Sequence, residues 1–316
     1  MNILITGIHG FVGSNLVSAL KDQHTIYGLD IMAPQKDGVV KTFGWEELEQ
    51  LQEVDVIVHL AGKAHDTKNQ TNAQAYFDIN TGLTKKIFDY FLTSTATKFI
   101  FFSSVKAAAD QVEGILTEEV IPSPKGPYGE SKLAAEQYIL DQLRIWNLKP
   151  GTWNKKLFIL RPCMIHGPGN KGNLNLLYGV VSRGIPWPLG AYDNRRSFTS
   201  IGNLSAIISQ LIEKDIEQGT YQMADDEPLS TNEIIRLIAE SKRSKAKIWN
   251  INTGLIKLAA RVGDLLHLPL NSERLKKLTD SYVVSNEKIK KALNINSMPV
   301  SAVEGMKRTL SSFEIK

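Results

Sequence analysis

The chain begins with a short apolar run that leads directly into a glycine-rich turn, and this start constrains the fold more than any other feature. Residues 3–6 form a β-rich run, glycines follow at positions 7, 10 and 13, and apolar residues recur at helical spacing over residues 11–20. A strand, a glycine turn and a helix in this order leave backbone N–H groups pointing outward at the helix start. The segment therefore predicts a turn that approaches the pyrophosphate of a dinucleotide closely.

Further apolar runs alternate with helical patterns through the first half of the chain. Strands are expected at 25–30, 55–60, 98–102 and 157–160, and helices at 73–93 and 128–147. Nearly continuous apolar strands are typical of a parallel sheet that is buried on both faces. The pattern predicts an α/β fold with a doubly wound parallel sheet of the Rossmann type.

The pattern changes after Arg161, where glycine and proline cluster and several short helices follow. We expect residues 1–162 to form the dinucleotide-binding domain, with its sheet completed by segments near 196–223. Residues 163–316 would then form mainly a smaller C-terminal α/β lobe that binds the substrate. Residues 230–233, with the sequence Ser-Thr-Asn-Glu, predict a capping box at the start of one helix in this lobe.

An acidic residue stands where a dinucleotide fold can use it. Asp30 ends the second expected strand, about 20 residues after the glycines, where a carboxylate accepts hydrogen bonds from the adenosine ribose hydroxyls and repels a 2′-phosphate. This position favours NAD over NADP as the cofactor. Lys36 is close enough in the sequence to leave NADP open.

Composition excludes several other classes of protein. Cys163 is the single cysteine, so the chain has no intrachain disulfide and no multi-thiolate metal site, and a reducing compartment is expected. No apolar run approaches the ~18 residues of a membrane span, and the first residues do not resemble a signal peptide. We expect a cytoplasmic protein with no bound metal and no membrane partner.

Charge is distributed unevenly along the chain. The net charge is +4, but residues 241–316 hold 15 Lys and Arg against 6 Asp and Glu. The simplest interpretation is a set of solvated helix faces, and the alternative is attraction of an anionic substrate. Nucleic acid is not expected as a partner, because no basic run is interleaved with aromatic residues and no recognition motif is present.

One tyrosine has the neighbours that a general base needs. Of nine tyrosines, only Tyr128 has a lysine four residues later, Lys132, and on a helix the two side chains share a face. Moving a phenol pKa from about 10 to about 7 needs about 4 kcal/mol, which nearby positive charges can supply. Ser103 and Ser104 directly follow the expected strand 98–102, at the edge of the sheet where open α/β folds bind ligands.

These motifs, in this order, resemble the extended short-chain dehydrogenase/reductase family, in particular its nucleotide-sugar epimerases, ketoreductases and dehydratases. The resemblance covers nearly the whole chain. Further matches to the family are residues 59–62 (His-Leu-Ala-Gly), Asn80, residues 160–162 (Leu-Arg-Pro) and residues 166–169 (His-Gly-Pro-Gly).

The resemblance implies a role for each matching residue. Tyr128 would be the general base, Lys132 would hold the nicotinamide ribose and lower the pKa of the tyrosine, and Ser104 would bond the reacting oxygen. Asn173 would contact the substrate diphosphate and Arg196 would clamp it, since a guanidinium pairs with phosphate oxygens bidentately. The residues expected to bind NAD are Gly7, Gly10, Phe11, Val12, Gly13, Asp30, Leu60, Ala61, Gly62, Asn80, Tyr128 and Lys132.

The sequence departs from the 4,6-dehydratases, which resemble one another in carrying an Asp-Glu pair after the catalytic hydroxyl residue. Val105 and Lys106 stand there, and neither can remove water by acid–base chemistry. The resemblance then implies an NAD-dependent 4-epimerase of a UDP-linked hexose that forms a transient 4-keto sugar and assembles as a homodimer. One alternative is a 4-ketoreductase of a UDP-4-keto-6-deoxy sugar in bacterial polysaccharide precursor synthesis. Another is a catalytically silent dinucleotide-sensing or scaffold protein.

Some polar residues near the expected site have simpler interpretations. His59 lies in a buried strand and is expected to be a core histidine with satisfied hydrogen bonds rather than a ligand. Lys63 and His65 follow that strand at the functional edge, where contact with substrate and ordinary exposure are equally expected. Cys163 is expected to be inert beside the sheet.

Overall fold

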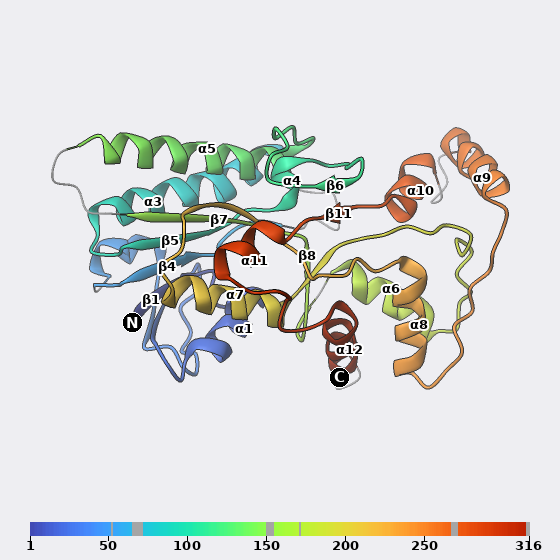
Figure 1. The fold of residues 1–316 in the computed structure, drawn as a ribbon, viewed down its shortest axis with the longest axis horizontal. Helices are drawn as coiled ribbons and strands as arrows, with labels where there is room; N and C mark the ends of the chain where they lie inside the picture. Colours follow the sequence, from blue (N-terminus) through green and yellow to red (C-terminus); the bar gives the residue numbers. More distant parts are fainter. Residues whose placement is uncertain (52, 65–71, 150–154, 171, 267–270, 314–316) are drawn as a thin grey trace.

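A seven-stranded parallel sheet forms the centre of the molecule, in the order β10-β7-β5-β4-β1-β2-β3 (Figure 1). The structure is a computed structural model that describes residues 1–51, 53–64, 72–149, 155–170, 172–266 and 271–313. This topology confirms the predicted doubly wound α/β fold, and it adds the short strand β3, which the sequence did not predict. The strands are β1 (Asn2–Thr6), β2 (Thr25–Leu29), β3 (Lys41–Phe43), β4 (Val56–His59), β5 (Lys98–Phe102), β7 (Lys156–Pro162) and β10 (Gly219–Met223).

Helices cover both faces of this sheet (Figure 1). One face packs against α1 (Phe11–Leu20), α7 (Ile201–Glu213) and α11 (Glu287–Leu293), and the other against α3 (Leu83–Thr93) and α5 (Pro127–Asn147). Successive strand residues enter the two cores in turn: Ile3 and Ile5 belong to the α1 side and Leu4 to the α3 side. Two separate apolar cores explain why the central strands are nearly continuous apolar runs.

The helix expected at 73–93 is not one regular α-helix. It consists of α2 (Ala73–Tyr76), the π-helical segment η2 (Phe77–Gly82) and α3. A π turn holds more residues than an α turn, so it shifts the direction of every side chain after it. Here the wide turn contains Asn80, whose fully buried side chain lies at the expected cofactor site.

The remaining elements lie mostly beyond the carboxyl edge of the sheet. Helices α6, α8 and α12 share one apolar core, while α9 and α10 pack around Leu189. Ser230 and Glu233 form the predicted capping box at the start of α8. These elements are η1 (Trp45–Gln50), α4 (Val105–Ala108), β6 (Ile115–Leu116), β8 (Met164–His166), α6 (Asn173–Ser182), β9 (Phe198–Ser200), α8 (Thr231–Ser241), α9 (Thr253–Leu266), α10 (Ser272–Thr279), β11 (Val283–Val284) and α12 (Ala302–Ser312).

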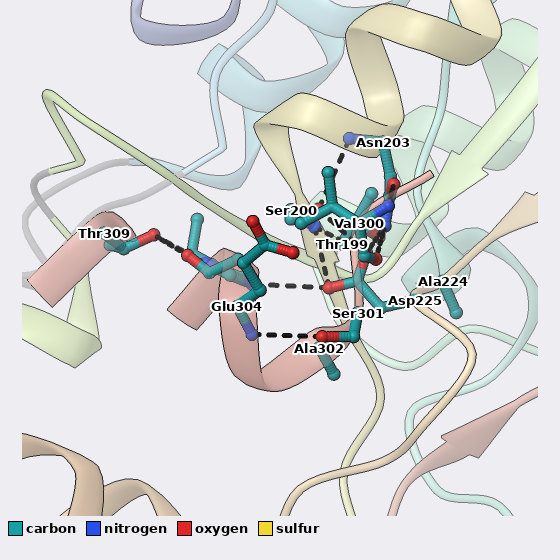
Figure 2. A network of polar contacts seen from close by, with 12 residues as sticks. Thr199, Ser200, Asn203, Ala224, Asp225, Val300, Ser301, Ala302, Glu304 and Thr309 are labelled. Carbon is teal, nitrogen blue, oxygen red and sulfur yellow. Dashed lines mark hydrogen bonds and ion pairs between the residues drawn. The ribbon is translucent and has the colours of Figure 1, made fainter. Parts of the chain in front are cut away.

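A buried carboxylate joins the sheet to the C-terminal segment. Asp225, just after β10, accepts hydrogen bonds from the backbone and hydroxyl of Ser200 and from the amide of Asn203 (Figure 2). The same Asn203 side chain bonds both the N–H and the carbonyl of Val300. Because every one of these groups is largely buried, the network fixes the start of α7 against the segment that leads into α12.

Candidate active site

The glycine turn and the loop after β4 meet at the carboxyl edge of the sheet. Gly7 has φ +68°, and a Cβ atom on it would lie 3.0 Å from the backbone of Ala61. A Cβ atom on Gly13 would lie 2.5 Å from the Gly7 carbonyl oxygen. The Thr6 hydroxyl accepts hydrogen bonds from the N–H groups of Leu60 and Ala61, at 3.1 and 3.0 Å. The turn can therefore hold this close approach only with glycine at both positions.

His59 is a core histidine with satisfied hydrogen bonds, as predicted. Its Nδ1 lies 2.7 Å from the Thr6 hydroxyl and its Nε2 lies 2.9 Å from the Thr84 hydroxyl. The Thr84 hydroxyl donates to the carbonyl of Asn80, so it accepts from Nε2–H, and Thr6 donates to Nδ1. Burial lowers the pKa of His59 well below its usual value, so the ring is neutral. A neutral ring is the form that both hydrogen bonds require.

Hydrogen bonds hold both Asp30 and Lys36 near the glycine turn. One Asp30 carboxylate oxygen accepts the N–H of His9 at 3.0 Å, and the other accepts the N–H of Ile31 at 2.8 Å. These bonds hold the carboxylate against the turn, at the end of β2. Lys36 Nζ donates to the hydroxyl of Ser14 in the first turns of α1, at 2.9 Å. Asp30 is thus held by the turn itself, whereas Lys36 is held by the helix that follows it.

Tyr128 and Ser104 lie together where α5 begins beside α4. Ser104 caps α4, and a hydrogen bond links its hydroxyl to the Tyr128 phenol. The two helices approach closely because Gly129 has no side chain: a Cβ atom there would lie 2.4 Å from the carbonyl oxygen of Lys106. Burial raises the pKa of Tyr128, the Ser104 hydrogen bond lowers it, and the nearby Tyr76 raises it. Without further positive charge the phenol keeps its proton at neutral pH.

Lys132 points from α5 toward the end of β5. Its Nζ donates to the carbonyl of Phe102 at 2.8 Å, and it lies beside Gly62, where a Cβ atom would be 3.0 Å away. Burial lowers the pKa of Lys132 to about 8, and the carboxylate of Glu136 opposes that shift. The ammonium group therefore lies between the tyrosine helix and the loop that carries Leu60, Ala61 and Gly62.

Asn80 holds that loop to α5. Its Oδ1 accepts the N–H of Lys63 at 2.7 Å, and its Nδ2 donates to the Lys63 carbonyl and to the Ser131 hydroxyl at 3.1 and 2.9 Å. Both N–H donors of the amide are engaged by the protein. The arrangement favours a positioning role for Asn80, acting through the loop and through Ser131, the neighbour of Lys132.

A buried ion pair that the sequence analysis did not single out as functional lies directly behind the reactive residues. Arg161 on β7 donates two hydrogen bonds to Glu136 on α5, with Nε to Oε1 at 2.9 Å and Nη2 to Oε2 at 2.5 Å. The Ser103 hydroxyl donates to the same carboxylate. Two signals were present in the sequence: Arg161 is a charge in an otherwise apolar strand, and Glu136 follows Lys132 by one helical turn.

The two residues expected to bind the substrate diphosphate, Asn173 and Arg196, differ in exposure and in the contacts that they make. Asn173 is the exposed first residue of α6. Arg196 donates through Nε to the carbonyl of Asp280, at 3.1 Å, and through Nη2 to the carbonyl of Lys277, so part of its guanidinium holds the end of α10. Arg196 and Lys277 both lie close enough to Lys106 to lower its pKa, although burial has the larger effect. Arg196 and Lys277 therefore lie near Lys106, which is the second residue after Ser104.

Cys163 is buried, and burial raises the pKa of its thiol, which favours the prediction that it is inert. Lys63 is half-buried, with its ammonium 5.9 Å from the centre of the Tyr76 ring. His65 lies outside the described residues. Tyr76 in turn packs edge-on against Tyr128, with ring centres 6.2 Å apart.

The described residues fit a dinucleotide. A Cβ atom on Gly7, Gly10 or Gly13 would lie within 3.1 Å of backbone atoms, and the helix that follows presents backbone N–H groups at its start. Asp30 is held beside this turn, and Lys132 lies beside Gly62. Comparison with known proteins agrees with this fit, because the NAD dependent epimerase/dehydratase family matches residues 3–224. The chain belongs to this family. Its cofactor is NAD, as predicted.

Relatives of this epimerase/dehydratase family member include two 4-epimerases. The UDP-glucose 4-epimerase of Vibrio cholerae is 32% identical over 257 residues, which are 75% of this chain and 75% of the relative. The N-acetyl-alpha-D-glucosaminyl-diphospho-ditrans,octacis-undecaprenol 4-epimerase of Escherichia coli O157:H7 is 27% identical over 330 residues, covering 98% of this chain and 94% of the relative. A solved structure of UDP-glucuronic acid 4-epimerase from Bacillus cereus with NAD has a TM-score of 0.75 at 19% identity and covers 100% of this chain and 99% of its own. It shares the fold.

Proposed function

We propose that the protein is an NAD-dependent 4-epimerase of a UDP-linked hexose. The observation that carries this proposal is the convergence of Tyr128, Ser104 and Lys132 at the sheet edge beside the glycine turn. The relatives support the same reaction class, since both act as 4-epimerases of sugar diphosphates. In the place of the acidic pair of the dehydratases, Lys106 directs its ammonium at the carbonyl of Asp110, so it offers no acid–base group for loss of water.

The residues divide the reaction between them. Tyr128, as the phenolate, accepts the proton of the C4 hydroxyl, and Ser104 hydrogen-bonds the same oxygen. NAD, when bound, would supply the acceptor for the C4 hydride and the donor for its return. Lys132 stabilises the phenolate through its positive charge and holds the nicotinamide ribose. If the 4-keto sugar turns over in the pocket, Tyr128 returns the proton to the C4 oxygen and the product is the alcohol of inverted configuration at C4.

The diphosphate is the part of the substrate that the second half of the chain would recognise. Arg196, Lys106 and Lys277 supply positive charge near Ser104, and Asn173 supplies an amide from α6. The carrier differs between the two relatives: it is uridine in one and undecaprenol in the other. Because the cations would contact phosphate oxygens, the same arrangement suits either carrier.

The proposal is tested by identifying any dinucleotide released from denatured protein, and by incubating native protein with UDP-glucose and UDP-N-acetylglucosamine without added cofactor. We expect released NAD and conversion of one of these sugars to its C4 epimer. Conversion of neither sugar, together with oxidation of added NADH by a UDP-4-keto-6-deoxy sugar, would contradict the epimerase and support the 4-ketoreductase. The variant Tyr128→Phe is the matched control, because it keeps the ring and removes the hydroxyl.

We further propose that the protein forms a homodimer through the helices 73–93 and 128–147, and that it works in the cytoplasm in polysaccharide precursor synthesis. Three large apolar residues of the α5 region, Leu140, Ile145 and Leu148, are exposed in the single chain and support the first proposal. The single buried cysteine supports a reducing compartment. Sedimentation velocity at micromolar concentration should give a dimer, and a monomer would contradict the proposal.

A further inference from the structure

Helix α9 exposes an apolar face that the described chain does not cover. Only Ile256, Ala260 and Gly263 of this helix are buried, and they form one narrow stripe against α10 and Leu189. The opposite side carries aliphatic residues at helical spacing, so they lie on one continuous face. The exposed fractions of its large side chains are 63% for Leu255, 58% for Leu258, 45% for Val262, 79% for Leu265 and 59% for Leu266.

Basic residues border this face. Lys257 and Arg261 are exposed, lie one turn apart along the edge between the buried stripe and the apolar face, and form no salt bridge with the described part of the chain. The surrounding segment, residues 241–280, holds nine Lys and Arg against three Asp and Glu. Trp249, in the segment leading into α9, is also more than half exposed. An aliphatic face with a basic border is typical of helices that lie in a membrane interface.

The position of α9 allows such a contact. Helices α9 and α10 lie at the end of the molecule that is farthest from the strands β1 and β4, and α9 forms the outer corner (Figure 1). The pair is also joined to the active-site edge, because Arg196 holds the end of α10 and Lys276 on α10 donates to Gln111, near α4. A flat surface can therefore contact α9, and the substrate lobe then lies close to that surface.

We propose that the α9 face docks on the surface of an anionic lipid bilayer. A second copy of this chain is the weaker occupant, because a symmetric contact would bring the same basic borders together. A protein partner usually meets aromatic or arginine anchors at the centre of the contact, whereas the large exposed side chains of α9 on this face are all aliphatic. No described helix is long and apolar enough to cross a membrane, so the contact is with the surface alone. The proposal departs from the sequence-based expectation of no membrane partner, and it does not depend on which sugar the site converts.

Vesicle flotation with the full-length protein tests the proposal. We expect binding to phosphatidylcholine vesicles that contain about one third phosphatidylglycerol, and weak binding to phosphatidylcholine alone. Raising NaCl from about 0.1 M to about 0.5 M should release the protein, because salt screens the basic border. The variant Leu258→Ser/Leu265→Ser should bind the anionic vesicles about tenfold less tightly, because two apolar side chains no longer enter the lipid.

The matched control is Ile115→Ser/Ile121→Ser, which removes two aliphatic side chains of similar exposure, 61% and 85%, away from α9. It should bind the vesicles as the unaltered protein does. Equal loss in both variants, or no binding of the unaltered protein to anionic vesicles, would overturn the proposal. A change of oligomeric state in Leu258→Ser/Leu265→Ser without lipid would also overturn it, because a second copy would then cover the face. Both variants should keep their turnover of dissolved substrate. Vesicle binding requires no turnover, so a failure of the proposed epimerase function is distinguished from a failure of the membrane proposal.

Discussion

Replacing Tyr128 with phenylalanine should lower kcat for C4 epimerisation by about 10²- to 10⁴-fold and leave NAD bound. The phenol is the group that takes the C4 proton in the proposed reaction, and Ser104 cannot replace it, since a serine hydroxyl is a far weaker acid. The phenylalanine ring retains the edge-on contact with Tyr76 and the place beside Gly129, so the fold of the site is preserved. Steady-state kinetics and the dinucleotide content of the purified variant measure the two parts of the prediction.

Tyr138 offers a matched control on the same helix. Its hydroxyl donates to Asp89 at 2.6 Å, and burial together with that carboxylate raises the pKa of Tyr138 to about 12. This phenol lies ten residues after Tyr128 and away from the sheet edge. The variant Tyr138→Phe should therefore keep kcat within about twofold, the change expected when no transition-state contact is lost. Equal activity in the Tyr128 variant and in the unaltered protein would remove Tyr128 from the mechanism.

Replacing Arg161 with methionine should lower the free energy of unfolding by about 3 to 5 kcal/mol. Arg161 and Glu136 are 5% and 2% exposed, so the variant leaves a carboxylate buried with only Ser103 as a hydrogen-bond donor among the groups described here. The lost ion pair lies directly behind the active site, because its neighbour Ser103 precedes Ser104 in the chain. Glu136 also acts on Lys132, since its carboxylate opposes the lowering of the Lys132 pKa by burial. Urea unfolding at pH 7 measures the loss of stability.

Arg195 provides the comparison for this variant. Its guanidinium lies 3.5 Å from Glu233, and both side chains are exposed. The same change, Arg195→Met, should cost about 0 to 1 kcal/mol, because an exposed ion pair is screened by water and salt. The double variant Glu136→Leu/Arg161→Met removes both buried charges and should recover much of the lost stability. A similar small loss for Arg161→Met and Arg195→Met would show that the buried pair does not hold β7 to α5.

The sequence predicted those parts of the fold that depend on local patterns. Strands buried on both faces are nearly continuous apolar runs, as in residues 99–102, and the glycine spacing after β1 follows from the contacts of Gly7 with the backbone of Ala61 and of Gly13 with the carbonyl of Gly7. Tyr128 and Lys132 were recognisable because their spacing of four residues belongs to one helix. Their proximity to Ser104 depended on the order of strands in a parallel sheet, which the alternation of strands and helices indicated.

Other features depend on contacts between distant segments. The π turn at Phe77–Gly82 lies in a sequence with ordinary helical spacing, and the roles of Asn80 and Glu136 depend on partners 17 and 25 residues away. Arg196 also bonds the carbonyls of Asp280 and Lys277 through Nε and Nη2, and these partners lie more than 80 residues further along the chain, where no local pattern indicates them. The exposure of the α9 face was also not predictable from the sequence, because apolar residues at helical spacing usually indicate a buried face.

The central claim is that Tyr128 and NAD remove and return hydrogen at C4 of one sugar. It is tested most directly with UDP-glucose and UDP-N-acetylglucosamine that carry deuterium at C4, incubated without added cofactor. At least one of them should give its C4 epimer with the deuterium retained at C4, because the hydride returns to the carbon that it left. Conversion of neither sugar, or an epimer that has lost its deuterium to solvent, would contradict the account.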